Sequence, residues 1–302
     1  MAISLVESAK LTQDALKKGV ITEYAQNSAA LEILPFIEME GNAFSYNREG
    51  ALPGIDFRAV NEAYKESSGT VNNQVARLAI LGGDVDVDKF IAQTRSNIND
   101  QRMVQTSLKV KAFARFFEKN FIDGDVGANP NGFDGLKKLT TTVVDAGENG
   151  NPLTLSMLDE LLDAVDGGPN VLLMSKEMRR NLKALIQAEN GYFETDGYDA
   201  FGRPVLMYGG VPIRTIGKDT NNAEILGFNE TQGTSADTGS IYALRVDEAD
   251  GVAGITNGGV QVYDLGELQQ KPAYRTRIEF YAGLVVQNSS SAARLKGVQR
   301  KI

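Results

Sequence analysis

The chain contains no histidine, no cysteine and no tryptophan. It therefore cannot form a Ser-His-Asp triad, a cysteine nucleophile, a disulfide within the chain, or a metal site that uses His or Cys ligands. It also lacks the commonest general acid and base near neutral pH, because that group is histidine. Carboxylate and lysine chemistry stays open, so the composition disfavours an enzyme without ruling one out.

Proline is also scarce, with 8 residues among 302, whereas 31 glycines indicate many turns. The formal net charge of −8 argues against a sequence-independent grip on nucleic acid, which requires Lys and Arg to neutralise phosphates. No run approaches the roughly 20 apolar residues of a membrane-spanning helix. The brief apolar start has no basic residues before it, so no secretory signal is visible. We therefore expect a soluble protein made in the cytoplasm, with one large or two modest domains.

Residues 35–81 are the most unusual stretch of the chain. Alternating apolar and polar residues over 37–48 and 75–81 predict two strands. The span between them, residues 49–74, is polar and poor in aliphatic side chains. Loops of this length are uncommon in compact domains unless they are functional or disordered, and a two-stranded arm alone is marginal in water. The sequence therefore predicts an arm that lies on another surface, which indicates assembly.

A long amphipathic helix is predicted next, from about Asp84 to about Phe121. Neither Gly nor Pro interrupts residues 85–123, and such a helix would be about 50 Å long. Asp84, Asp86 and Asp88 would stabilise its N-terminus through the helix dipole. This interpretation is preferred over a metal site, because the cluster lacks the Gly and Glu of an EF-hand loop. The aromatic end of the helix is expected to be core: Phe113, Phe116, Phe117 and Phe121.

The rest of the chain has a mixed α/β pattern. Helices are predicted over residues 153–165 and 176–188, the second capped by Ser175. Strands are predicted over residues 171–174, 203–208, 211–216, 260–263 and 274–286. Gly209 and Gly210 are interpreted as a turn, because no phosphate-loop motif surrounds them. The C-terminus is basic, and we expect a solvated end or pairing with acidic neighbours at Arg294, Lys296, Arg300 and Lys301.

The order of these elements, together with local sequence, resembles the major capsid proteins of tailed bacteriophages, which have the Hong Kong ninety-seven type of fold. Residues 129–136 (Asn-Pro-Asn-Gly-Phe-Asp-Gly-Leu) resemble the entry into the axial domain of that family. The segments 201–205 and 210–213 are similar to its paired-strand signature. The close of the chain, residues 274–286 and 291–297, resembles the usual ending of these proteins. Together and in order, these motifs cover nearly the whole chain.

The resemblance implies an α+β fold with an N-terminal arm, residues 1–34, and an extended β-hairpin loop, residues 35–81, that lies over an adjacent subunit. Residues 82–128 would form the peripheral domain with the long spine helix. Residues 129–237 would form an axial α/β domain around the five- and six-fold axes, and residues 238–302 would give strands to both domains. Many relatives begin with a scaffolding segment. Here the arm begins almost at Met1, so scaffolding is expected to be a separate protein or unnecessary.

Contacts between subunits are expected on the extended loop, and the candidates are Arg48, Arg58, Glu62, Tyr64, Lys65 and Glu66. Some relatives crosslink subunits through a loop Lys and a distant Asn. Lys65 is the only Lys in residues 35–81, but it lies in a polar charged run. Ordinary salt bridging, about 0–1 kcal/mol per pair, is therefore the preferred interpretation. No catalytic, cofactor-binding or metal residue is expected.

The resemblance implies a structural protein, not an enzyme, whose pentamers and hexamers form an icosahedral capsid around a phage genome. The virion would assemble in the bacterial host cytoplasm, with scaffolding, portal or decoration proteins as further partners and no membrane. The acidic balance fits a wall that encloses DNA without specific binding. One alternative is an encapsulin-like bacterial nanocompartment, which the long span 49–74 disfavours. The other is a carboxylate-dependent enzyme, which the absence of His disfavours.

Overall fold

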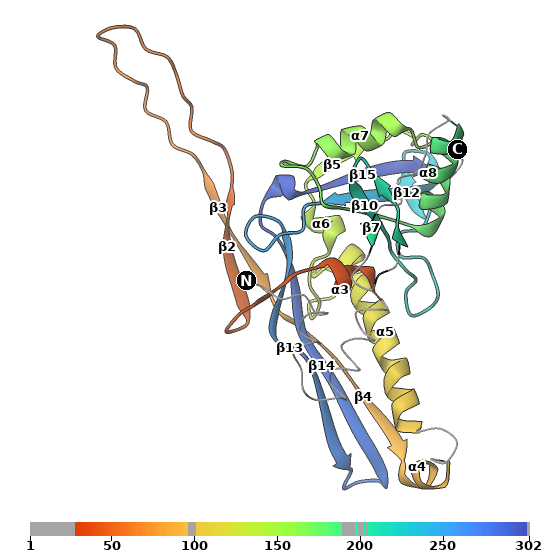
Figure 1. Cartoon of the computed structure of the whole chain (residues 1–302). Coiled ribbons are helices and arrows are strands. Elements are labelled where there is room, and N and C mark those ends of the chain that lie inside the picture. The colour runs from red at the N-terminus through yellow and green to blue at the C-terminus, as the bar shows by residue number, and fades with distance from the viewer. Residues whose placement is uncertain (1–27, 96–100, 189–196, 199–201, 203, 301–302) are drawn as a thin grey trace.

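The structure is a computed structural model that describes residues 28–95, 101–188, 197–198, 202 and 204–300. Most of the expected N-terminal arm (residues 1–27) lies outside the described residues, as do Lys301 and part of the strand expected over residues 203–208. The fold is α+β and contains two main sheets. Figure 1 shows one sheet extended beside a long helix, the other within a compact module, and a ribbon that projects away from both.

The elongated sheet has four strands in the order β1-β13-β14-β4. β14 runs antiparallel to both β13 and β4, whereas β1 is parallel to β13. A 23-residue helix, α5, lies along one face of this sheet (Figure 1), and its length is about 35 Å. The bounds are β1 (Phe36–Glu38), β4 (Ala79–Asp88), β13 (Val252–Glu267), β14 (Ala273–Val286), α4 (Lys89–Arg95) and α5 (Gln101–Asp123).

Phenylalanine rings join α5 to the elongated sheet. The centroid of the Phe117 ring lies 5.9 Å from that of Phe280 on β14, and Phe36 on β1 lies 5.5 Å from the same ring. Phe113 and Phe121 are buried in the same cluster, so the aromatic end of the predicted helix is core. The exception is Phe116, which points away from the sheet and is 43% exposed.

The predicted start of the long helix is wrong. Asp84, Asp86 and Asp88 lie on strand β4, and helical structure begins only at Lys89. The segment alternates Asp with Val, which is the two-residue period of a strand, and Val87 is buried while the aspartates face the other side.

The aspartates of β4 pair with arginines on β14 instead of capping a helix. Arg275 donates from Nε and Nη2 to Asp86 at 2.6 and 2.8 Å, and Arg277 donates to Asp84 at 2.7 and 3.0 Å. These hydrogen bonds hold the pKa of both carboxyl groups below the usual value. The acidic cluster is therefore half of a cross-strand ion-pair ladder.

The second sheet has the strand order β5-β15-β12-β6-β10-β9, with β11 paired to β12. The predicted helix over 176–188 and strand over 171–174 are confirmed residue for residue, and Ser175 Oγ accepts the Met178 N–H at 3.1 Å as the expected cap. Gly209 and Gly210 form the predicted turn between β9 and β10, both with positive φ (57° and 80°). A second apolar cluster lies between this sheet and its helices.

The strands of this module are β5 (Thr142–Asp145), β6 (Val171–Met174), β7 (Gly197–Tyr198), β8 (Pro204–Val205), β9 (Met207–Tyr208), β10 (Val211–Thr215), β11 (Glu230–Gln232), β12 (Ser235–Leu244) and β15 (Ala292–Gln299). Its helices are α6 (Leu136–Leu139), α7 (Leu155–Asp163) and α8 (Lys176–Ala188). A short helix α3 (Ala29–Ile33) precedes β1, and a 3-10 turn (Ser289–Ser291) precedes β15.

The ribbon consists of β2 (Ala43–Glu49) and β3 (Val71–Arg77), paired from Ala43↔Arg77 to Glu49↔Val71. The two predicted strands are therefore confirmed with shifted bounds, because the outer parts of the alternating segments join the elongated sheet as β1 and β4. None of the helices in the described part of the chain is long and apolar enough to cross a membrane.

Candidate assembly surface

The base of the ribbon is packed against the elongated sheet through its alternate residues. Phe44, Tyr46 and Ala76 contact a small apolar cluster that contains Ile255 and Val285. These two residues alternate along β13 and β14 with residues of the α5 core, so the cluster lies on the sheet face opposite α5. The base of the ribbon therefore has a core.

Arg48 adds a polar anchor one step further along β2. Its Nη2 donates a hydrogen bond to the Val286 carbonyl oxygen on β14 at 2.6 Å. Burial raises the pKa of the neighbouring Tyr46 hydroxyl. The nearby positive charge of Arg48 lowers this pKa, but by less than burial raises it. The ribbon is thus fixed to the sheet at its base, although it is a separate two-stranded unit.

Beyond Glu49 and Val71 the ribbon opens into a loop of residues 50–70, which projects away from the body (Figure 1). Every residue from 50 to 75 is exposed. Near the ribbon, the Gly50 N–H donates to the Thr70 carbonyl at 2.8 Å, and the Thr70 N–H donates to Ala51 at 2.9 Å. Local contacts of this kind define the path of the loop, which has no core beneath it.

A turn closes the far part of the loop. Asn61 has a positive φ of 70°, and the Ala59 N–H donates to Glu62 Oε2 at 3.2 Å. Arg58 donates to the Glu62 carbonyl at 3.2 Å, and its guanidinium carbon lies 5.0 Å from the centroid of the Tyr64 ring. The turn therefore has a defined shape although it is exposed to solvent.

The loop carries a set of large apolar side chains that we call the loop tip. Each of them exposes at least 71% of its reference area. Large apolar side chains that are exposed together on one loop indicate an interaction surface. The loop tip consists of Leu52, Ile55, Phe57, Val60 and Tyr64.

The six residues named from the sequence fall in two places. Arg48 lies at the packed base and bonds within the chain, whereas Arg58, Glu62, Tyr64, Lys65 and Glu66 all lie on the exposed loop. Lys65 makes a 3.5 Å ion pair with Asp56 between two exposed side chains, as the preferred interpretation expects of a weak surface pair. The contact role of the six stays a prediction.

Sequence reasoning named mainly the charged and aromatic loop residues and missed the aliphatic ones. The available signal was the recurrence of Leu52, Ile55, Phe57 and Val60 within a stretch that had already been judged too polar for a core. Apolar residues that have no core of their own to join are candidates for burial against another molecule.

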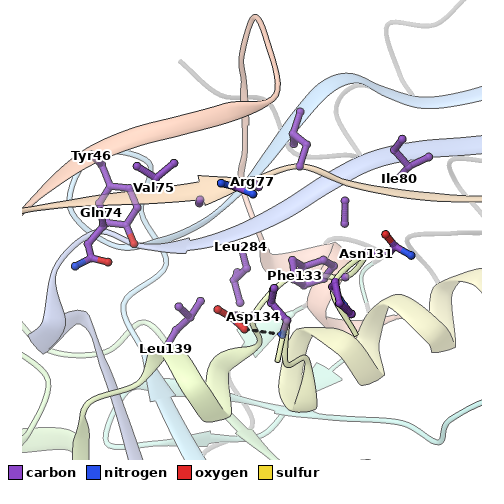
Figure 2. Close-up of a pocket in the computed structure, with 16 residues that line it drawn as sticks. Tyr46, Gln74, Val75, Arg77, Ile80, Asn131, Phe133, Asp134, Leu139 and Leu284 are labelled. Atoms are coloured by element: carbon purple, nitrogen blue, oxygen red, sulfur yellow. Dashed lines mark hydrogen bonds between the residues drawn. The ribbon is translucent and has the colours of Figure 1, made fainter. Parts of the chain in front are cut away.

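A groove of about 670 Å³ lies at the ribbon base, and we call it the base groove. Figure 2 shows Val75, Arg77 and Ile80 on one wall, with Phe133, Leu139 and Leu284 across from them. The full lining is Tyr46, residues 74–80, Val126, residues 130–134, Leu139 and Leu284.

The loop opposite the ribbon gives the base groove its second wall. Asp134 Oδ1 accepts the Val126 N–H at 2.9 Å, the bond drawn in Figure 2, and also pairs with Lys138 at 2.8 Å. The Gly124 and Gly135 backbones approach so closely that a side chain at either position would collide with them. This wall is therefore a fixed surface.

The buried charged groups lie outside the base groove and form hydrogen bonds that hold neighbouring elements together. Glu118 on α5 is 1% exposed and accepts N–H bonds from Ala29 at 3.0 Å and from Gly217 at 3.3 Å. Burial raises the pKa of the Glu118 carboxyl to about 7, because desolvation outweighs these hydrogen bonds. Glu118 thereby connects α5 to α3 and to the end of β10.

Glu230 and Asp123 line the same pocket, and other side chains already bind Glu230. Arg294 donates to both oxygens of Glu230 at 2.8 and 2.9 Å, Ser240 donates to the same carboxylate, and Lys137 lies 3.3 Å away. These donors occupy the carboxylate, so the group is a tie between β11, β12 and β15. Within the described ranges, no three acidic groups come together in an arrangement that could hold a metal ion.

The basic C-terminal residues are paired within the chain where they are described. Besides the Arg294 pair, Lys296 lies 3.1 Å from Asp145 and Arg300 lies 2.9 Å from Glu177. The expectation of pairing with acidic neighbours is therefore confirmed for these three residues.

Comparison with known proteins gives a consistent family signal. Residues 14–158, just under half of the chain, match the protein family described as Major capsid protein GP7. A search of curated protein sequences returned no match.

Solved structures match over most of the chain. The SrpI encapsulin of Synechococcus elongatus PCC 7942 is 20% identical, with a TM-score of 0.68 over 89% of this chain and 87% of that one. The capsid of the native GTA particle is 14% identical, with a TM-score of 0.63 over 90% of each chain. A chain from Microbacterium phage Oxtober96 is 17% identical, with a TM-score of 0.62 over 90% of each.

At these identities the structural matches establish the fold, and the family match shows that residues 14–158 are similar to a major capsid protein. The expected α+β fold is confirmed, since the matched chains span nine-tenths of this one. The resemblance drawn from the sequence is thereby confirmed: the chain has the Hong Kong ninety-seven type of fold and is similar to the major capsid proteins of tailed bacteriophages.

Proposed function

We propose that this chain is the major capsid protein of a tailed bacteriophage, and that many copies assemble into the icosahedral shell around the genome. The subunits form pentamers and hexamers in the virion, which is assembled in the host cytoplasm. The role is structural and not enzymatic. Separate scaffolding, portal or decoration proteins are further partners, and the acidic wall, with a net charge of −8, encloses DNA without binding it specifically.

The proposal divides the chain by role. Residues 1–34 are the N-terminal arm, and residues 35–81 are the extended loop that lies on a neighbour. Residues 82–128, with the spine helix, belong to the peripheral domain, and residues 129–237 form the axial domain. Residues 238–302 supply strands to both: β13 and β14 to the elongated sheet, β12 and β15 to the other.

The main observation behind the proposal is that the body is well packed whereas the projecting loop exposes large apolar side chains. The body has large buried clusters, yet the loop tip exposes five large apolar side chains on a projecting loop. Repeated association of such surfaces, each modest alone, gives a shell collective stability.

Electron microscopy of the purified full-length protein tests the proposal, with closed shells as the expected result. A matched variant replaces residues 50–70 by Asn-Gly, a two-residue turn suited to the directly opposed pair Glu49↔Val71. This variant should keep the circular dichroism spectrum of the wild type but fail to form shells. A wild type that stays monomeric under all assembly conditions would overturn the proposal.

An encapsulin-like compartment is the second candidate, favoured by the structural match to the SrpI encapsulin. The two functions differ in content. Particles isolated from the native source should contain nuclease-resistant DNA if the phage proposal holds, whereas a protein cargo without DNA would favour the compartment.

A further inference from the structure

We propose that the base groove of each subunit receives the loop tip of a second copy of this chain. This inference rests on the proposed shell assembly, and it adds the place on the neighbour where the loop binds. The two surfaces are on one sequence but far apart in one molecule, and each is incomplete without the other.

The base groove has a mixed polar and apolar lining, and several of its apolar side chains stay solvent-exposed within the part of the chain that the structure describes. Ile80 is 76% exposed and Val75 is 56% exposed on one wall, and Val126 is partly exposed on the other. A volume of about 670 Å³ falls within the range of sites that bury small ligands. It has room for several side chains of the kind that the loop tip presents, such as Phe57 and Leu52.

A subunit cannot fill its own groove with its own tip. The groove includes ribbon residues Tyr46 and Gln74, whereas the loop leaves the ribbon at Glu49 and Val71 and continues outward (Figure 1). Each arm of the loop has about ten residues, which span about 33 Å when extended. We therefore assign the occupant of the groove to the loop of another copy.

When two copies bind through two different surfaces, the interface between them is not a two-fold symmetric one. A tip that enters the next subunit's groove leaves the first groove free for the preceding subunit, so the interface is heterologous. Such interfaces close into rings when the rotation between copies allows it. This is the geometry that the proposed pentamers and hexamers require.

The charges of the two surfaces are complementary. Arg77 lies in the groove wall and is exposed, and its guanidinium makes no ion pair with any residue in the described ranges. The loop carries three acidic side chains and two basic ones: Asp56, Glu62 and Glu66, with Arg58 and Lys65. A small acidic excess on the loop therefore meets a groove that carries an unpaired cation, which favours encounter in the correct register.

Disulfide trapping tests the contact directly, because the natural chain has no cysteine. The test variant combines Phe57→Cys with Ile80→Cys, and the control combines Phe57→Cys with Val143→Cys. Val143 is also an exposed apolar strand residue, but it lies on β5 of the other sheet. After oxidation of assembled particles, we expect at least about tenfold more crosslinked product in the test pair, because docking raises the effective concentration.

The pattern of products is informative as well. The test pair should give a ladder of oligomers on a denaturing non-reducing gel, whereas Phe57→Cys alone can give no species larger than a dimer. Particles that assemble but show no excess crosslinking over the control would overturn the groove contact and leave the proposed function standing. A failure to form particles at all in the cysteine-free protein would overturn the proposed function instead.

Ile80→Asp provides an independent test, since it places a charge on the exposed groove wall. Its melting temperature as a monomer should match the wild type, while its yield of shells should fall at least about tenfold. Val143→Asp is the matched control and should assemble normally. Normal assembly of Ile80→Asp would contradict the proposal.

Discussion

The base of the ribbon and the loop tip belong to one continuous projecting segment, yet they use apolar residues in opposite ways. At the base, Phe44 and Tyr46 pack on Ile255 and Val285 of the elongated sheet. At the loop tip, the side chains of Ile55 and Phe57 are exposed to solvent. The first set stabilises the subunit, and the second is available to a neighbour. Exposure along this segment therefore separates residues that stabilise the subunit from those that we propose take part in assembly.

The largest difference is expected between two isoleucines, one buried and one exposed. Ile255→Ala removes a fully buried side chain and should lower the free energy of unfolding by about 2–5 kcal/mol. Ile55→Ala removes a side chain that is 94% exposed and should change it by no more than about 0.5 kcal/mol. Urea unfolding of the monomers measures both, and equal effects would refute the division.

The next largest effect concerns pH and tests the body alone. The folded pKa of Glu118 is raised to about 7, above its ordinary value of 4.5. Between these values the folded state binds more protons than the unfolded state, so stability should fall as pH rises from about 4.5 to about 7, by about 3 kcal/mol in total.

Glu118→Gln should remove most of that slope, because glutamine does not titrate. Melting curves across this pH window measure it, and Glu62→Gln, which changes an exposed carboxylate of the loop, serves as control. An unchanged slope in Glu118→Gln would show that the buried carboxylate does not govern this pH dependence.

Two arginines, one on the ribbon and one on the loop, differ in the same way. Arg48→Ala removes the hydrogen bond to the Val286 carbonyl and should cost about 1–3 kcal/mol of subunit stability. Arg58→Ala, on the loop, should leave the stability of the monomer unchanged and act only on shell yield. Hydrogen–deuterium exchange at β14 should rise in Arg48→Ala and stay constant in Arg58→Ala.

The smallest effect is expected for the exposed ion pair of the loop. Lys65→Ala removes a single 3.5 Å contact with Asp56 and should leave the melting temperature unchanged. Arg275→Ala removes a two-point pair with Asp86 and should lower the melting temperature. Because the pKa of Asp86 is lowered in the fold, that pair stabilises the protein above the unfolded pKa and is lost as pH falls. A Lys65 effect as large as that of Arg275 would contradict this ranking.

Much of the fold could be predicted because residue periodicity, helix caps and turn residues are visible in short stretches of the sequence. The period of helix 176–188, its Ser175 cap and the Gly209-Gly210 turn each have a short-range physical cause. The error at Asp84 arose because carboxylates suit both a helix start and a polar strand face. The partners that decide between them, Arg275 and Arg277, lie about 190 residues away along the chain.

The proposed assembly surface was predicted as a region with six candidate residues, and the exposed aliphatic side chains were not among them. Alternation identified the ribbon, and the length of the polar span identified the loop. Which apolar side chains lack partners is a property of packing, so Ile55 and Ile80 emerged only from the structure. The base groove depends on β3, β4 and residues 130–134 meeting in space, and no local pattern encodes that meeting.

The close succession of β3 and β4 has a mechanical consequence. Only Leu78 separates the two strands, so the chain that carries the loop continues directly into a ten-residue ladder against β14. A pull on the loop acts along the direction of β4 and loads the hydrogen bonds of that ladder together, in shear, rather than opening them one at a time. Tension between neighbouring subunits would therefore be carried along the length of the elongated sheet and away from the small cluster at the ribbon base.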